Sequence, residues 1–119
     1  SKLDETLIVG EKRIELGTSD YGDVVCGHGY KWMTSFQQSL FPEWIFSVEK
    51  ITLKKTIAMV HGANTTLISY EVIDADCSFE MELLPLVAYR GYHELKKQDN
   101  FIHREGVFKE HTLAINAYE

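Results

Sequence analysis

Three side chains that can bind a polar ligand stand within four residues of one another, at Arg90, Tyr92 and His93. They offer a planar set of hydrogen-bond donors, a ring with a hydroxyl, and an imidazole that donates or accepts near neutral pH. They follow an expected strand that ends at Tyr89, and Gly91 breaks its alternation of apolar and polar residues. The group suits a glycan or a domain interface. The alternative, which the residues alone favour, is that Tyr92 packs locally and Arg90 pairs with a surface glutamate.

Aromatic residues in or beside expected loops and strand ends form a second group of candidates. Rings at such places can stack on the C–H faces of sugars while polar side chains bind the hydroxyls. A tryptophan in a small β domain more often belongs to the core, so we assign Trp44 to the core and leave Trp32 open. The candidate residues for glycan binding or interdomain contact are Arg90, Tyr92, His93, Trp32, Tyr30 and His28.

Other kinds of chemistry find little support in the sequence. The five histidines do not stand at metal-ligand spacing on one predicted face, so no metal site is expected. A nucleophile elbow and a glycine-rich phosphate cradle are both lacking. Glu80 and Glu82 share a strand face, as a pair of glycosidase carboxylates would, but nothing in the sequence would bury them and raise a pKa. We therefore interpret them as a solvated face and predict no catalytic residue and no cofactor.

Composition limits the class of protein and its partners. The chain has 119 residues, a single-domain length, and a net charge of −6 without a basic stripe, which excludes nucleic acid as an expected partner. An apolar run long enough to cross a bilayer is lacking, as is a secretion leader, so no membrane partner is expected. We interpret Cys26 and Cys77 as free thiols in a reducing cytosol, and a single disulfide is the alternative. The expected location is therefore the cytoplasm.

The segment 41–89 is expected to form four strands in succession. Apolar and polar residues alternate with a period of two, which predicts strands with one buried face. Strands joined by short connections pair antiparallel, so we expect a β-meander. Lys55 lies on the apolar face of its strand, which we place near a sheet edge or end. The expected core residues of these strands are Phe46, Leu53, Ile57, Met59, Phe79, Met81 and Leu83.

The remaining segments also favour β-structure. Gly10-Glu11 fits a two-residue type II′ hairpin turn, and residues 17–29 form a long glycine-rich loop. Glu49-Lys50 lacks the residues that a tight hairpin prefers, so we expect a longer or bulged turn there. Two short strands are expected at residues 107–108 and 113–117. We therefore predict an all-β fold, an antiparallel β-sandwich of roughly eight strands that occupies residues 1–119 as one domain.

Several stretches of the chain are similar to a known family. FPEW, MVHGANTT and LLPLVAYRGYH are the most specific of them, and with SKLDETLIVGEKRIELGT the similarity covers nearly the whole chain. The sequence resembles the N-terminal domain of bacterial and archaeal glycogen debranching enzymes. That resemblance implies a β-sandwich of the supersandwich type, which precedes an (α/α)-barrel carrying the amylo-α-1,6-glucosidase activity. AYRGYH matches a motif typical of the family, and this favours a functional role for Arg90, Tyr92 and His93.

The resemblance implies a non-catalytic domain that helps to bind α-glucan, such as glycogen or limit dextrin, and supports the catalytic domain. The alternative is a structural domain that packs on the barrel and binds no sugar alone. We expect the chain to be a fragment of a larger glycoside hydrolase whose barrel is absent. An interface bared in this way would also favour self-association of the fragment.

Overall fold

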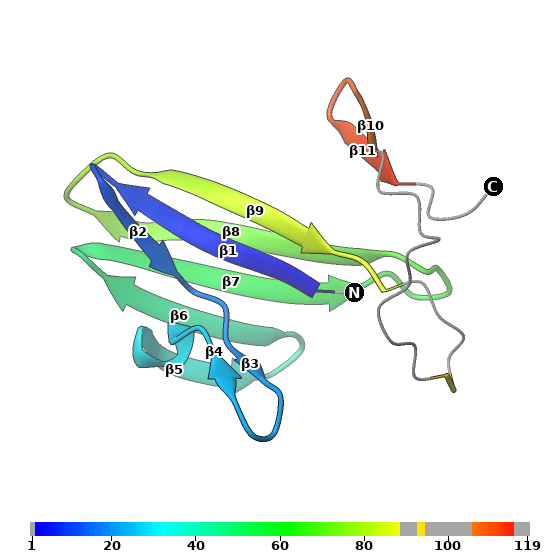
Figure 1. The fold of residues 1–119 in the computed structure, drawn as a ribbon, viewed down its shortest axis with the longest axis horizontal. Coiled ribbons are helices and arrows are strands. Elements are labelled where there is room, and N and C mark those ends of the chain that lie inside the picture. Colours follow the sequence, from blue (N-terminus) through cyan, green and yellow to red (C-terminus); the bar gives the residue numbers. More distant parts are fainter. Residues whose placement is uncertain (1, 89–92, 95–105, 116–119) are drawn as a thin grey trace. The chain divides into compact units, whose positions relative to one another are not determined.

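The computed structural model describes residues 2–88, 93–94 and 106–115, which belong to two compact units (Figure 1). The larger unit spans Lys2–Leu86, and the smaller one includes Val87–Glu119. Every paired strand in the described part of the chain is antiparallel, and its only helical element is a 3-10 turn at Gly29–Lys31. The predicted all-β class is confirmed, with eleven described strands rather than roughly eight.

Two sheets make up most of the larger unit. The four-stranded sheet has the order β5–β6–β7–β8, with β5 (Met33–Gln38), β6 (Pro42–Val48), β7 (Ile51–Met59) and β8 (Thr66–Ala75). The three-stranded sheet has the order β2–β1–β9, with β1 (Lys2–Val9), β2 (Lys12–Glu15) and β9 (Glu80–Leu86). Between them along the chain, β3 (Ser19–Asp20) and β4 (Val25–Cys26) pair as a short ladder.

The core lies between these two sheets and confirms the sandwich. Both sheets contribute the buried apolar side chains, which are Leu7, Ile14, Leu16, Phe46, Val48, Ile51 and Leu53. Trp44, Phe79 and Met81 are half-buried and pack against this cluster, so the assignment of Trp44 to the core is confirmed. Burial of the apolar face of each sheet against the other is what makes two sheets more stable than one.

The predicted four-stranded meander is wrong in its last strand. β6, β7 and β8 pair in succession, but β9 leaves this sheet and pairs with β1 from Lys2↔Leu86 to Ile8↔Glu80 (Figure 1). β5 takes the fourth place instead, beside β6. Alternation of apolar and polar residues shows which side of a strand is buried but does not identify the neighbouring strand. The sequence pattern therefore could not predict that β9 pairs with β1 in the second sheet.

Five of the seven expected core residues lie outside the fully buried cluster. Met59 and Leu83 are 72% and 45% exposed, which contradicts the prediction. Ile57, Phe79 and Met81 are half-buried. The core cluster is built on the first half of β7, at Ile51 and Leu53, so residues near the end of that strand extend beyond it. The apolar face of a strand is therefore longer than the part that its partner sheet covers.

Lys55 is correctly placed on the apolar face of β7, but β7 is a central strand, so its expected position at an edge is wrong. Its ammonium forms an ion pair and a hydrogen bond with Glu5 Oε1 of β1, and Glu5 is 4% exposed. The Tyr70 hydroxyl of β8 donates to the same oxygen at 2.6 Å, and Lys55 Nζ lies 5.9 Å from the centroid of the Trp44 ring. The carboxylate of Glu5 and the π face of Trp44 together stabilise the Lys55 ammonium inside the sandwich.

The predictions for the turns at Gly10-Glu11 and Glu49-Lys50 had different outcomes. Gly10 has a φ of 60° between the paired residues Val9 and Lys12, and the predicted two-residue turn is confirmed. Glu49 and Lys50 also form a two-residue loop, because Val48 pairs with Ile51, and the expected longer or bulged turn is wrong. Their φ values of 47° and 64° place both in the left-handed region that favours glycine.

The smaller unit contains one described hairpin. β10 (Gly106–Lys109) pairs with β11 (Thr112–Ile115), which confirms an expected strand at residues 107–108 and the expected second strand as far as Ile115. Residues 116–117 of that expected strand lie outside the described residues. Among the described residues, no helix is long and apolar enough to cross a membrane.

Candidate functional site

The face of the three-stranded sheet that points away from the core carries a group of polar side chains. Strand residues alternate between the two faces, so the neighbours of buried Leu7 and Ile14 point outward. We call this surface the outer face, and its polar members from β1, β2 and β9 are Lys2, Asp4, Thr6, Arg13, Glu15, Glu80 and Glu82. Three neighbouring strands thus present their side chains to one surface.

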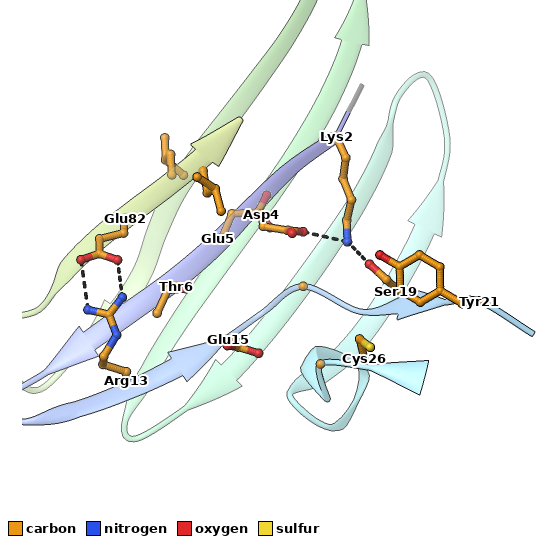
Figure 2. A pocket seen from close by; sticks show the side chains of 14 residues that line it. Lys2, Asp4, Glu5, Thr6, Arg13, Glu15, Ser19, Tyr21, Cys26 and Glu82 are labelled. Carbon is orange, nitrogen blue, oxygen red and sulfur yellow. Dashed lines mark hydrogen bonds and ion pairs between the residues drawn. The ribbon is translucent and has the colours of Figure 1, made fainter. Parts of the chain in front are cut away.

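Two pockets open on the outer face. The larger one has a volume of about 560 Å³ and reaches from β9 to the glycine-rich stretch, where Tyr21 and Cys26 line it (Figure 2). The smaller one has a volume of about 290 Å³ and is lined in part by His28 and Trp32. Thr6, Arg13 and Glu15 line both pockets. The two pockets are therefore adjacent, with these three side chains between them.

An ion pair holds Arg13 in place at the junction of the pockets. Its Nη1 donates to Glu82 Oε1 at 3.0 Å and its Nη2 to Glu82 Oε2, across the intervening strand β1 (Figure 2). The hydrogen bond and the charge of Arg13 lower the pKa of Glu82, and Glu82 raises the pKa of Arg13 in the same way. The charge of Glu15 also raises the pKa of Arg13. Both members of the pair are therefore charged at neutral pH.

Lys2 connects β1 with the glycine-rich stretch. Its ammonium lies 2.7 Å from Asp4 Oδ1 and donates a hydrogen bond to Ser19 Oγ (Figure 2). Asp4 Oδ1 is buried and has no hydrogen-bond partner among the described residues, so the Lys2 ammonium balances its charge without a well-directed hydrogen bond. A Cβ at Gly17 would lie 2.8 Å from this oxygen. Glycine at that position therefore lets Asp4 fit against the chain.

Glycines bring the following loop close to the end of β2. A Cβ at Gly29 would lie 1.8 Å from the carbonyl oxygen of Leu16, and one at Gly27 would lie 2.4 Å from that of Gly17. The amide of Tyr30 donates to Thr18 Oγ1 at 3.1 Å, which fixes the loop a second time. The predicted long loop is therefore built from a short ladder and a 3-10 turn packed on the chain before it. This packing positions the aromatic residues of the loop beside the outer face.

The aromatic candidates of this loop have different surroundings. Trp32 is 36% exposed and lines the smaller pocket together with His28. Tyr30 is 53% exposed, and its ring lies 6.1 Å from the His28 ring, but it lines neither pocket. Tyr21, which is 73% exposed, lines the larger pocket. Each pocket therefore has one large aromatic ring at its wall.

The other three candidate residues belong to the smaller unit. Arg90 and Tyr92 lie outside the described residues, and His93 is exposed. The structure describes the two units separately, so these three candidates stay a prediction. Sequence reasoning missed Lys2, Arg13 and Glu15, whose only signal was their place opposite buried residues on alternating strands. The sequence predicts that Glu82 belongs to a solvated face. In the structure its side chain is exposed and forms an ion pair with Arg13.

Groups of acidic residues, histidines or cysteines that could share a metal ion do not occur in the described ranges. The family model described as "Glycogen debranching enzyme N terminal" matches residues 1–119, which is the whole chain. No curated protein and no solved structure shows significant similarity to it. The chain therefore belongs to the family of glycogen debranching enzyme N-terminal domains.

Proposed function

We propose that this chain is a non-catalytic domain that helps to bind α-glucan, such as glycogen or limit dextrin, and supports a catalytic domain that hydrolyses α-1,6 branch points. The family supplies the substrate class. The observation that carries the proposal is the outer face, where ion pairs fix charged side chains and one exposed aromatic ring lines each of two adjacent pockets. Sugars present hydroxyls and apolar C–H faces, and the two kinds of group on this face match them.

One carboxylate of the outer face, that of Glu82, supports the proposal that this domain is non-catalytic. Glycoside hydrolysis needs a carboxylic acid whose pKa is raised, so that it can protonate the leaving oxygen near neutral pH. The pKa of Glu82 is lowered by Arg13, which makes Glu82 unsuitable as this acid. We propose that the parent enzyme carries its acid and base in another domain. Release of glucose from limit dextrin by this chain alone, above a buffer control, would contradict that.

Affinity electrophoresis in gels with and without glycogen tests the binding function. We expect the 119-residue chain to migrate more slowly in the glycogen gel, relative to a protein that does not bind glucan. Unchanged migration would favour the alternative, a domain that only packs on the catalytic domain.

That second candidate function is favoured by a separate observation. Large apolar side chains of the larger unit are strongly exposed, among them Leu40 at 83% and Met59 at 72%. Such side chains mark contact surfaces when they gather, and the C-terminal catalytic domain of the same protein is the proposed partner. In the isolated chain the same side chains would favour self-association, which sedimentation velocity over a concentration series measures.

The proposed location of the protein is the cytoplasm, where Cys26 and Cys77, which are exposed and form no disulfide, stay reduced.

We further propose that Arg90, Tyr92 and His93 face the catalytic domain or its substrate. The support is their chemistry and the family membership. The double substitution Arg90→Ala with His93→Ala should leave the melting temperature of the chain nearly unchanged and lower debranching by the full-length enzyme. Unfolding of the variant chain would assign these residues a structural role instead.

A further inference from the structure

We propose that the two pockets of the outer face form one continuous site for an extended segment of α-glucan, with Arg13 and Glu15 at its centre. Tyr21 and Trp32 would contact sugar rings on the two sides of this centre. This inference rests on the proposed glucan-binding function and names the place on the chain where the glucan binds.

Continuity of the site follows from the shared lining. Thr6, Arg13 and Glu15 line both pockets, so a ligand that fills one of them touches the same side chains as a ligand in the other. Strand pairing sets this arrangement, because Thr6 of β1 is paired with Glu15 of β2 on one side and with Glu82 of β9 on the other. An oligosaccharide suits two adjacent pockets better than a single sugar does.

The centre of the site combines fixed donors with an available acceptor. Two nitrogens of Arg13 are engaged by Glu82, which orients the guanidinium and leaves its other N–H groups available for hydroxyl oxygens. Glu15 is exposed, and its carboxylate accepts no hydrogen bond from the described residues, so it can accept bonds from sugar hydroxyls. Hydrogen bonds to charged groups are stronger than those between neutral groups. A hydroxyl group both donates and accepts hydrogen bonds, so a ligand rich in hydroxyls can bond to the donors of Arg13 and to the acceptor of Glu15.

The two rings supply apolar contact beyond the centre. Tyr21 is at the wall of the larger pocket and Trp32 at the wall of the smaller one. The close approach of Gly29 to Leu16, together with the hydrogen bond from Tyr30 to Thr18, fixes the loop that carries both rings. A site whose groups are held before the ligand arrives loses less conformational entropy on binding.

Titration with maltohexaose, followed by amide chemical shifts of the 119-residue chain, tests the site directly. We expect the largest shifts at Tyr21, Trp32 and the outer-face residues of β1 and β2. Glu15→Ala and Tyr21→Ala should each weaken binding about tenfold, since each removes a contact of the kind that carries binding energy. Both side chains are exposed, so these variants should fold normally.

A matched control variant exists in the same hairpin. Glu11→Ala removes an exposed carboxylate from the turn before β2, and Glu11 lines neither of the two pockets. This variant should bind maltohexaose as the original chain does. An equal loss of binding in the control would overturn the proposed site.

The outcomes separate the site from the function. If glycogen still retards Glu15→Ala and Tyr21→Ala like the original chain, the site is wrong and the binding function stands. Shifts confined to the smaller unit would lead to the same conclusion. If glycogen does not retard the original chain and maltohexaose at millimolar concentration shifts no amide, the site and the proposed function are both wrong.

Discussion

Two ion pairs lie on opposite faces of the three-stranded sheet, and they differ in almost every property. Lys55 and Glu5 meet inside the sandwich, with side chains 16% and 4% exposed, and Tyr70 donates a further hydrogen bond to Glu5. Arg13 and Glu82 meet on the outer face, with side chains 57% and 54% exposed. Glu5 and the outward-pointing Thr6 are adjacent in β1, so one strand separates the two environments.

This difference separates a structural role from a binding role. Inside the sandwich, a lost partner leaves a charge in a poor solvent, so the pair is tied to folding. On the outer face, water replaces a lost partner, and screening leaves an exposed pair a small effect on stability. Charged groups there are available for a ligand without endangering the fold. We therefore expect stability to depend on the inner pair and binding to depend on the outer one.

The largest effect is expected from Lys55→Ala. This change leaves the buried Glu5 carboxylate with Tyr70 as its only described partner, and it should lower the free energy of unfolding by about 3 kcal/mol. Urea denaturation followed by tryptophan fluorescence measures the change. The control is Lys54→Ala, which removes the neighbouring ammonium on the other face of β7 and its more exposed pair with Glu71, whose side chains are 29% and 59% exposed. A loss in the control as large as in Lys55→Ala would remove the contrast between buried and exposed pairs.

Replacement of both inner charges sharpens the same comparison. In Glu5→Leu with Lys55→Met, no charge is left unpaired, and apolar side chains of similar size fill the space. Most of the stability lost in Lys55→Ala should therefore return. A double variant as unstable as Lys55→Ala would mean that the ion pair itself, rather than the unpaired charge, determines stability.

A smaller effect is expected from Tyr70→Phe, which removes the 2.6 Å hydrogen bond to Glu5 and should cost about 2 kcal/mol. The same residue gives a pH signature. Desolvation, and then the hydrogen bond to and charge of Glu5, raise the pKa of Tyr70 above its ordinary value. The folded state then holds this proton more tightly than the unfolded chain does.

The sign of the pH effect follows from that order. The contribution of Tyr70 is fully present below about pH 10, the ordinary tyrosine value, and decreases as the pH rises above it. Urea midpoints measured from about pH 8 to about pH 11 should therefore fall more steeply in the original chain than in Tyr70→Phe. Parallel curves for the two proteins would contradict the proposed link between Tyr70 and Glu5.

The smallest effect on stability is expected on the outer face. Arg13→Ala and Glu82→Ala should leave the urea midpoint almost unchanged near pH 7, because both side chains are exposed. Retardation by glycogen should nevertheless decrease in Arg13→Ala. Acid should have the same effect on the original chain. Because Arg13 lowers the pKa of Glu82, the pair is complete above about pH 4 and is lost as the pH falls further. A marked loss of stability in Arg13→Ala at neutral pH would assign the outer pair a structural role.

The strands were predictable from the sequence because alternation is a local signal. Partners across the fold were not. Lys55 was recognised as an irregularity, but Glu5 is one of many acidic residues and lies fifty positions earlier in the chain, so sequence reasoning placed Lys55 at an edge. Glu49 and Lys50 were misread for a different reason: turn preferences describe the residues that adopt positive φ easily, whereas here strand register forces two others into that region.

The candidate site was predictable only where a side chain has distinctive chemistry. His28 and Trp32 were selected as an imidazole and a large ring beside a glycine-rich loop, and both line the smaller pocket. Arg13 and Glu15 were overlooked, because charged residues that alternate with Ile14 and Leu16 form the same pattern on a flat surface as beside a pocket. The pocket itself depends on the loop that packs next to β2, which no local pattern reports.

The pairing of β1 with β9 has a consequence for the order in which the protein folds. The four-stranded sheet joins strands that are consecutive in the sequence, so its contacts close short loops. Lys2 and Leu86 are paired in the three-stranded sheet, but they are the first and last residues of the larger unit in the sequence. Contacts between residues that are distant in the sequence form slowly, because closing the long intervening loop costs conformational entropy. During synthesis β1 and β2 leave the ribosome before β9, so their sheet cannot be completed until β9 has also been made. Strands that are made early in this unit are therefore among the last to become native.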